Sequence, residues 1–381
     1  MNHADTASYP PQAATDASID YFDHLQRYSA LYRILLATPY STNVMLKQWY
    51  RINLKLVNEL DLALTGQQKS SCWLEVGCQL LVEKDQSIIP SKECLIQCRP
   101  LQHDAWDSTT ASDIAGFQND TVGDLEFMVS LQDEGYDNSS FLIIQEDWSL
   151  GTPGKMWDSA LVLSQMITDR IKHNPDYFEK RCLVDLSAGT GCLGLLIAAL
   201  YKNIYKDHQD TMPHITLTDL PDALNLIYQN RSYNHLEGHT KVKPLEWGNY
   251  QDVQNLLLEG PLHTVIASDV LYRPSTFYSL VQTLIWLCDE SENQVEIYVG
   301  YKRRGLLLCD EQKFFDLCAQ SFEIITVSAM PAVNGAVGQT KISSPALLEG
   351  WILNEGGLNA ICRDTGVSIY QLIRKRNLLS M

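Results

Sequence analysis

The sequence predicts an α/β fold, in which a mostly parallel sheet carries helices on both faces and follows an N-terminal α+β extension. From about residue 150 onward, short apolar runs alternate with stretches of helical apolar spacing, which is the pattern of parallel strands joined by crossover helices. One of these runs enters a turn of small residues that opens an apolar helix. We therefore divide the chain into a polar tail at 1–18, an accessory region at 19–145 and a main domain at 146–381.

The accessory region is expected to contain two helices and several short strands. Apolar residues recur at helical spacing over 21–36 and 46–64, with Pro39 between the two segments. Four strand-like runs follow, at 73–82, 93–98, 125–131 and 141–145, and a polar loop is expected at 104–124. In the second run, alternation places Cys94, Ile96 and Cys98 on one face of the strand.

The main domain is expected to contain seven strands, the first five followed by helices or loops in regular order. The predicted strands are 182–186, 215–219, 242–247, 264–269, 295–301, 322–328 and 367–373, and the predicted helices are 193–201, 221–234, 275–288 and 310–320. The last two strands lack a clear helix between them, so we expect them to pair antiparallel, with 330–366 as a long insertion.

Charge and cysteine content narrow the class of protein. The 381 residues include 29 Lys and Arg against 46 Asp and Glu, a net charge of −17, which disfavours a nucleic-acid track because such a track needs a concentrated basic face. The ten cysteines show no C-x-x-C pair, so we expect core thiols and no metal site. No secretory signal and no apolar run of roughly 20 residues is visible, which predicts a reduced intracellular protein without a membrane span.

The strongest chemical signal is the segment 183–194, Leu-Val-Asp-Leu-Ser-Ala-Gly-Thr-Gly-Cys-Leu-Gly. A buried strand that enters a turn of small residues and then a helix presents backbone N–H groups to a ligand, and small residues let the ligand approach the main chain. Asp219 ends the next strand, where a carboxylate can accept the ribose hydroxyls of an adenosine-containing ligand. Alternatively, Asp219 is a structural residue, in a turn or as the N-cap of a helix that begins at Pro221.

In its main domain the chain resembles the family-16 seven-β-strand protein-lysine methyltransferases, which use S-adenosylmethionine. The resemblance covers about 140–375 and leaves the first 140 residues unexplained. Five segments carry it, namely Lys-Met-Trp-Asp-Ser-Ala-Leu-Val-Leu at 155–163, the glycine turn at 185–194, Thr-Asp-Leu-Pro at 218–221, Pro-Leu-Glu-Trp-Gly at 244–248 and Ala-Ser-Asp-Val-Leu-Tyr at 267–272.

The resemblance implies a role for each matched position. Cofactor contacts are implied for Trp157, Ser187, Ala188, Gly189, Gly191, Asp219, Trp247 and Ser268, and orientation of the acceptor nitrogen for Asp269 and Tyr272. Ser187 departs from the family, which has a glycine there. Because serine does not readily adopt a positive φ, either the backbone at Ser187 is β-like or the turn is altered.

The resemblance also implies an activity, the N-methylation of a lysine on an intracellular protein such as a translation factor, in the cytoplasm or the nucleus. Two alternatives stay open: methylation of a small amine, and a cofactor-binding interaction protein without turnover, which the serine at 187 motivates. Oligomeric state and target are left open. The basic run at 301–304 is interpreted as solvated loop charge rather than as a contact for an acidic surface.

Overall fold

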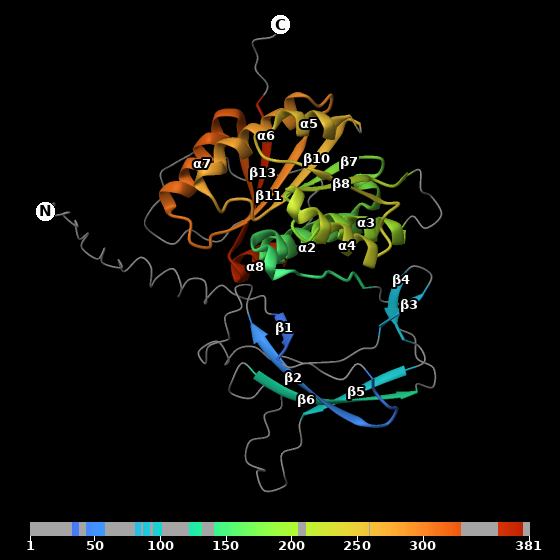
Figure 1. Cartoon of the computed structure of the whole chain (residues 1–381). Helices are drawn as coiled ribbons and strands as arrows, with labels where there is room; N and C mark the ends of the chain where they lie inside the picture. The colour runs from blue at the N-terminus through green and yellow to red at the C-terminus, as the bar shows by residue number, and fades with distance from the viewer. Residues whose placement is uncertain are drawn as a thin grey trace, which may run out of the picture.

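The computed structural model describes ten segments of the chain, and all structural statements below refer to them. They are residues 33–37, 43–57, 81–84, 87–91, 94–100, 122–131, 141–204, 211–258, 260–328 and 357–375. The described residues form a main domain around a seven-stranded sheet and a smaller set of N-terminal strands that lie below it in Figure 1.

The seven-stranded sheet confirms the predicted α/β fold. Its strands are β7 (Cys182–Leu186), β8 (His214–Asp219), β9 (Thr240–Pro244), β10 (Leu262–Ser268), β11 (Glu296–Lys302), β12 (Phe322–Ser328) and β13 (Val367–Arg374). They lie in the order β12-β13-β11-β10-β7-β8-β9. The pairs from β11 to β9 are parallel, whereas β13 runs antiparallel to both β11 and β12, as expected for the last two strands.

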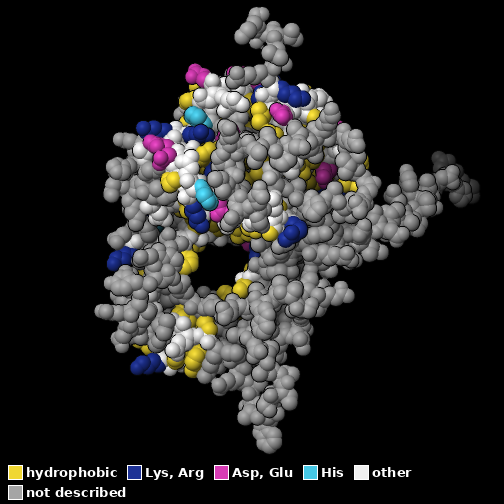
Figure 2. Space-filling model, turned by 180° about the vertical axis from the view of Figure 1, so that it is seen from behind, with side chains coloured by type: hydrophobic (Ala, Val, Ile, Leu, Met, Phe, Trp, Pro, Cys, Tyr) yellow, Lys and Arg dark blue, Asp and Glu magenta, His cyan; other side chains and the backbone are white. Residues whose placement is uncertain are grey.

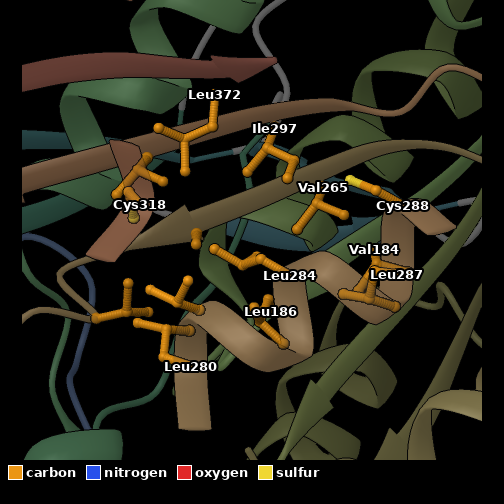
Figure 3. Close-up of a cluster of buried hydrophobic side chains, with 14 of the residues drawn as sticks. Val184, Leu186, Val265, Leu280, Leu284, Leu287, Cys288, Ile297, Cys318 and Leu372 are labelled. Carbon is orange, nitrogen blue, oxygen red and sulfur yellow. The ribbon is translucent and has the colours of Figure 1, made fainter. Parts of the chain in front are cut away.

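Helices cover both faces of this sheet. One face packs against α2 (Asp158–His173), α3 (Cys192–Ile204), α4 (Leu224–Tyr233) and α8 (Gly357–Thr365), and the other against α5 (Tyr250–Leu257), α6 (Phe277–Asp289) and α7 (Leu308–Ser321). Figure 3 shows the second interface, where strand residues such as Val265 and Ile297 meet Leu284 of α6. Helix α8 lies inside the predicted insertion at 330–366, and the apolar stripe of Leu358 and Cys362 packs it onto the sheet.

The N-terminal strands form a second, antiparallel sheet. Its members β1 (Arg33–Leu36), β2 (Trp49–Val57), β5 (Cys94–Pro100) and β6 (Val122–Leu131) lie in the order β1-β2-β6-β5, and β3 (Leu81–Lys84) pairs with β4 (Ser87–Pro90) as a separate hairpin. The predicted strands at 93–98 and 125–131 are confirmed. Cys94, Ile96 and Cys98 pack together against the small core of this sheet, as alternation predicts. The predicted strand at 73–82 lies largely outside the described residues.

The predicted helix at 46–64 is wrong over its described part, because residues 49–57 form strand β2. Tyr50, Ile52 and Leu54 alternate along the strand and pack against Phe127 and Val129 of β6. The same apolar residues fit both the helical spacing and the alternation of a strand. The pairing with β6 decides in favour of the strand. Of the helix predicted at 21–36, the described residues 33–36 form strand β1, and the remainder lies outside the described segments.

Residues 141–145 lie extended without joining a sheet beyond a single bridge at Phe141. The side-chain amides of Asn230 in α4 and of Asn234, which caps the end of that helix, make the backbone hydrogen bonds that a neighbouring strand would make. Asn234 accepts from the N–H of Ile143 and donates to its carbonyl, and Asn230 does the same for Gln145. Within the described segments, no helix is both long enough and apolar enough to cross a membrane.

Candidate functional site

The site lies where the strand order of the main sheet reverses. Strands β7 and β10 are neighbours, and the chain proceeds from β7 outward through β8 on one side and from β10 through β11 on the other. In open α/β sheets, ligands bind at the carboxyl ends of the strands at such a switch point. The residues that follow these two strands are Ser187 after β7 and Asp269 after β10, and both were predicted from the sequence as site residues.

The turn after β7 is fixed by backbone hydrogen bonds to its neighbours. The N–H of Ala188 donates to the carbonyl of Thr218 at 2.8 Å, and the N–H of Gly191 donates to the carbonyl of Ala188 at 2.8 Å. Gly189 and Gly191 have positive φ angles of 58° and 79°. A side chain at Gly191 would lie 3.0 Å from Leu217, so this position needs glycine both for its backbone angle and for the close approach of helix and sheet.

Ser187 adopts the glycine-like backbone conformation. Its φ angle is 58°, in the left-handed region, so the β-like backbone considered as one alternative for this position is wrong. L-residues occupy this region at a cost of about 1–2 kcal/mol. Asp269 has a φ angle of 54°, so the first residues after both switch-point strands are strained non-glycine residues. Strain of this kind persists only where the surroundings determine the backbone, and it concentrates at ligand sites.

Asp219 is held next to the turn. One carboxylate oxygen accepts from the N–H of Gly189 at 2.8 Å, and the other accepts from the N–H of Leu220 at 2.7 Å. Burial raises the pKa of Asp219, and the two backbone donors oppose that rise. The short helix that begins at Pro221 has no side-chain cap, so the N-cap alternative for Asp219 does not hold. Each oxygen keeps acceptor capacity for a further donor.

Two aromatic side chains stand beside Asp219. The indole N–H of Trp247 donates to the hydroxyl of Ser187 at 3.0 Å, and its ring centroid lies 6.1 Å from that of Tyr272. Burial raises the pKa of the Tyr272 hydroxyl, Arg273 lowers it and the charge of Asp219 adds to the rise. Tyr272 is nevertheless 45% exposed, so its ring forms part of the open mouth of the site. The structure thus brings Ser187, Asp219, Trp247 and Tyr272 together.

Asp185 lies behind the turn and is fully buried. Its Oδ2 accepts from the N–H of Gly194 in the first turn of α3 at 2.8 Å, whereas its Oδ1 is buried with no hydrogen-bond partner within the described segments. Burial raises the pKa of Asp185 to about 7, the Gly194 N–H opposes this, and the charge of Asp219 adds to it. Asp185 therefore joins strand β7 to helix α3 and titrates near neutral pH.

Asp269 is surrounded by donors from other elements. One oxygen accepts from the N–H of Lys302 at 3.1 Å and from the guanidinium of Arg304 at 2.5 Å, and the other accepts from the N–H of Ser159 at 3.3 Å. The guanidinium of Arg304 also lies 4.9 Å from the centre of the Trp157 ring. Asp269 and Trp157, both predicted from the sequence, are thus linked through Arg304. Ser268 ends β10 beside Gly300.

Several residues that shape the site were not predicted. Arg304 is 13% exposed at its side chain, so it is not the solvated charge expected for the run 301–304. Lys302 of the same run forms a buried ion pair with Asp158 at the start of α2. The basic run at the end of a predicted strand was a signal for both, since the carboxyl ends of parallel strands meet at one edge. For Asn230, which joins Gln145 to the carbonyl of Thr190 in the glycine turn, the sequence carries no signal.

The described residues include no group of three or more His, Cys, Asp or Glu side chains that could hold a metal ion. The fold and the site together define a Rossmann-like domain, with a turn of small residues, the buried carboxylate of Asp219 and two aromatic rings at its switch point.

Residues 136–321 match the family model of the lysine methyltransferases. A protein named EEF1A lysine methyltransferase 3, from Xenopus tropicalis, is 31% identical over 41% of this chain and 60% of its own length. The protein N-lysine methyltransferase METTL21A of Mus musculus is 31% identical over 39% of this chain and 62% of its own. The matched region thus spans about 60% of the length of these curated relatives.

Further relatives are more distant. The protein-lysine N-methyltransferase EFM2 of Saccharomyces cerevisiae is 29% identical over 32% of this chain and 30% of its own length. A solved structure titled a putative SAM-dependent methyltransferase from Streptococcus mutans aligns with a TM-score of 0.35 at 9% identity, over 65% of this chain and 58% of that one. The fold assignment therefore rests on the strand order of the chain itself.

Proposed function

We propose that this chain is an S-adenosylmethionine-dependent protein-lysine N-methyltransferase. The observation that carries the proposal is the grouping of Ser187, Asp219 and Trp247 at the switch point of a domain that matches this family. The residues fit the cofactor by their chemistry. The Asp219 carboxylate has acceptor capacity for ribose hydroxyls, the Trp247 ring offers a face for adenine, and the glycine turn leaves the main chain accessible. Trp157, Ala188, Gly189, Gly191 and Ser268 line the same edge of the sheet and complete the proposed cofactor site.

The cofactor, when bound, supplies an activated methyl group on a sulfonium, so the side chains need little covalent chemistry. Their part is to align a lysine nitrogen and to exclude water. A lysine of pKa about 10.4 must lose a proton as it is desolvated. Tyr272 stays protonated because burial raises its pKa, and a phenol oxygen has acceptor capacity for a hydrogen bond from an approaching amine. Tyr272 is therefore our proposed catalytic residue.

Asp269 is better suited to positioning than to direct contact with the amine. Its oxygens are already engaged by the backbone of α2 and β11 and by Arg304. With these donors in place it holds the end of β10 against Trp157 and α2.

A protein acceptor suits the mouth of the site better than a small amine. Large apolar side chains are exposed in the segments that follow the strand ends, namely Leu220, Tyr272, Tyr278, Leu307 and Leu308. Exposed apolar groups beside a site are typical of surfaces that receive another protein. The net charge of −17 favours a basic acceptor surface, such as that around a lysine. Two matched relatives are named for a translation factor or for protein lysine, and we infer an intracellular protein substrate of the same kind.

Transfer of a labelled methyl group tests the proposal. The full chain is incubated with methyl-labelled S-adenosylmethionine and extract of cells that lack it, and labelled products are separated into protein and metabolite fractions. We expect a discrete labelled protein, with the label on lysine by mass spectrometry, and its loss in Asp219→Ala. Label confined to metabolites would instead favour a small-amine methyltransferase, and saturable cofactor binding with no transfer to either fraction would favour an interaction protein.

A further inference from the structure

The segment 146–157, here called the strap, closes on itself before it reaches helix α2. The N–H of Asp147 donates to the carbonyl of Gly154 at 2.9 Å, and the N–H of Met156 donates to the carboxylate of Glu146 at 2.5 Å. Two short 3-10 turns, Trp148–Leu150 and Thr152–Gly154, lie between these contacts. Glu146 thus joins the two ends of the strap.

The strap lies directly against the proposed cofactor site. A side chain built at Gly189 of the glycine turn would come within 3.0 Å of the carbonyl oxygen of Pro153, so the strap and the turn are in close contact. The strap ends at Trp157, whose indole N–H donates to the carbonyl of Thr152 at 3.0 Å. The conformation of the strap therefore sets both the packing over Gly189 and the position of Trp157.

A residue of the N-terminal sheet holds the strap from outside. Arg33, in strand β1, donates from its guanidinium to the carbonyl of Met156 and forms an ion pair with Glu146 at 3.0 Å. The guanidinium also lies 5.8 Å from the ring centre of Trp148. The side chains of Arg33 and Glu146 are only 15% and 17% exposed, so water screens this pair less than a surface pair.

The placement of Arg33 matters because it joins the N-terminal sheet to the main domain. In the view of Figure 2, an opening separates the described side chains of the lower sheet from those of the main domain, and hydrophobic side chains lie on both sides of it. Strand β1 is the edge strand of the lower sheet, next to β2. Its arginine therefore gives the sheet a direct contact with the strap.

We propose that Arg33 is a positioning residue that fixes the strap against the glycine turn and so couples the N-terminal sheet to cofactor binding. The proposal rests on the proposed function, because it assumes that the glycine turn binds S-adenosylmethionine. Arg33 donates a hydrogen bond to the carbonyl of Met156 at the end of the strap. It also pairs with the carboxylate of Glu146, which joins both ends of the strap. Without it, the strap is ordered in a smaller fraction of molecules, and apparent affinity falls by that fraction.

The test compares the full chain with Arg33→Ala and with Arg51→Ala, a matched control on the adjacent strand where the arginine side chain is exposed. Calorimetry measures the Kd for S-adenosylmethionine, and hydrogen–deuterium exchange without cofactor measures the backbone amides of 147–157. For Arg33→Ala we expect a Kd and a cofactor KM raised about 10-fold with kcat within about twofold, and faster exchange confined to the strap. Arg51→Ala should match the unmodified chain in each of these measurements.

The outcomes separate the two proposals. If the unmodified chain does not bind S-adenosylmethionine, the proposed function fails. In that case faster strap exchange in Arg33→Ala still supports the positioning of the strap by Arg33, and unchanged or slower exchange overturns it. If it binds and Arg33→Ala binds equally well with unchanged exchange, the role of Arg33 is overturned. Should Arg33→Ala fold poorly, Arg33→Gln, which keeps a donor for the Met156 carbonyl, is measured under the same criteria. A fall in kcat at unchanged Kd and KM would also contradict a positioning role.

Discussion

The indole N–H of Trp247 donates to the hydroxyl of Ser187 at 3.0 Å, which ties the loop after β9 to the turn after β7. A glycine at position 187 would offer no such acceptor. The serine thus carries backbone strain at a φ of 58° and provides a contact that fixes the proposed adenine-binding ring. The feature that motivated an interaction protein without turnover is therefore compatible with a formed cofactor site.

This relationship predicts different outcomes for two substitutions of Ser187. Ser187→Ala keeps the strain and loses the hydrogen bond, so we expect the free energy of unfolding to fall by about 1 kcal/mol. Ser187→Gly loses the same bond but relieves the backbone strain. We therefore expect its free energy of unfolding to be higher than that of Ser187→Ala by about 1 kcal/mol. Urea denaturation measures both. Equal stability of the two variants would show that position 187 is not strained.

Asp219→Asn should weaken cofactor binding more than it weakens the fold. The amide offers one acceptor in place of two and has no charge, so we expect the Kd for S-adenosylmethionine to rise by about 10- to 100-fold, since a hydrogen bond to a charged group contributes about 1.5–3 kcal/mol. The matched control is Asp222→Asn, at an exposed position three residues further on. Calorimetry measures the Kd of both variants. An equal effect of the two substitutions would show that Asp219 does not contact the cofactor.

The main domain could be predicted from the sequence because its signals are local. The strand before Ser187, the glycines after it and the acid at 219 each lie within a few residues of a strand end, and parallel strands place their carboxyl ends at one edge. Contacts between distant segments could not be predicted. Arg304 contacts Trp157 and Asp269 only after β11 and α2 have packed, so its place in a basic run after a strand indicates the edge of the sheet but not these partners.

The N-terminal half was less predictable for a different physical reason. The apolar residues from Trp49 to Val57 satisfy both a helical and an alternating pattern, so only the pairing of β2 with β6 decides between them. The extended segment 141–145 likewise depends on Asn230 and Asn234, which are about 90 residues away in the chain.

Substitution of Asp269, which pairs with Arg304, tests whether this carboxylate positions its neighbours or takes part in proton transfer. Asp269→Asn keeps a residue that tolerates the left-handed backbone and removes the charge, so we expect stability to fall by about 3 kcal/mol, because the arginine is left partly buried. The KM of the variant for the cofactor should rise, because Arg304 loses its partner and no longer holds Trp157 in place. The pH profile of kcat should keep its shape. Loss of one limb of that profile would instead make Asp269 a proton acceptor. Asp269→Asn combined with Arg304→Gln should recover part of the lost stability.

Asp185 predicts how stability depends on pH. Burial raises its pKa in the folded chain to about 7, whereas an unfolded aspartate has a pKa of about 3.9. Between these values the folded chain binds the additional proton, so the stabilising contribution of Asp185 is complete below about pH 4 and is lost as the pH rises through about 7. A shift of this size corresponds to about 4 kcal/mol over the full range.

Asp185→Asn removes this titration and leaves an acceptor for the N–H of Gly194. Its absolute stability is a poor readout, since the new amide N–H₂ is itself buried where no partner was present for Oδ1 in the described segments. The pH dependence is the informative quantity. We measure urea denaturation from pH 5 to 8.5 for both proteins. We expect the unmodified chain to lose stability relative to Asp185→Asn from pH 5 to about 7, and the difference between the two proteins to level off above that pH. The exposed control Asp222→Asn should follow the unmodified chain. A constant difference between the Asp185→Asn and unmodified curves would mean that Asp185 does not titrate in this range, because only a group whose protonation changes can alter the slope.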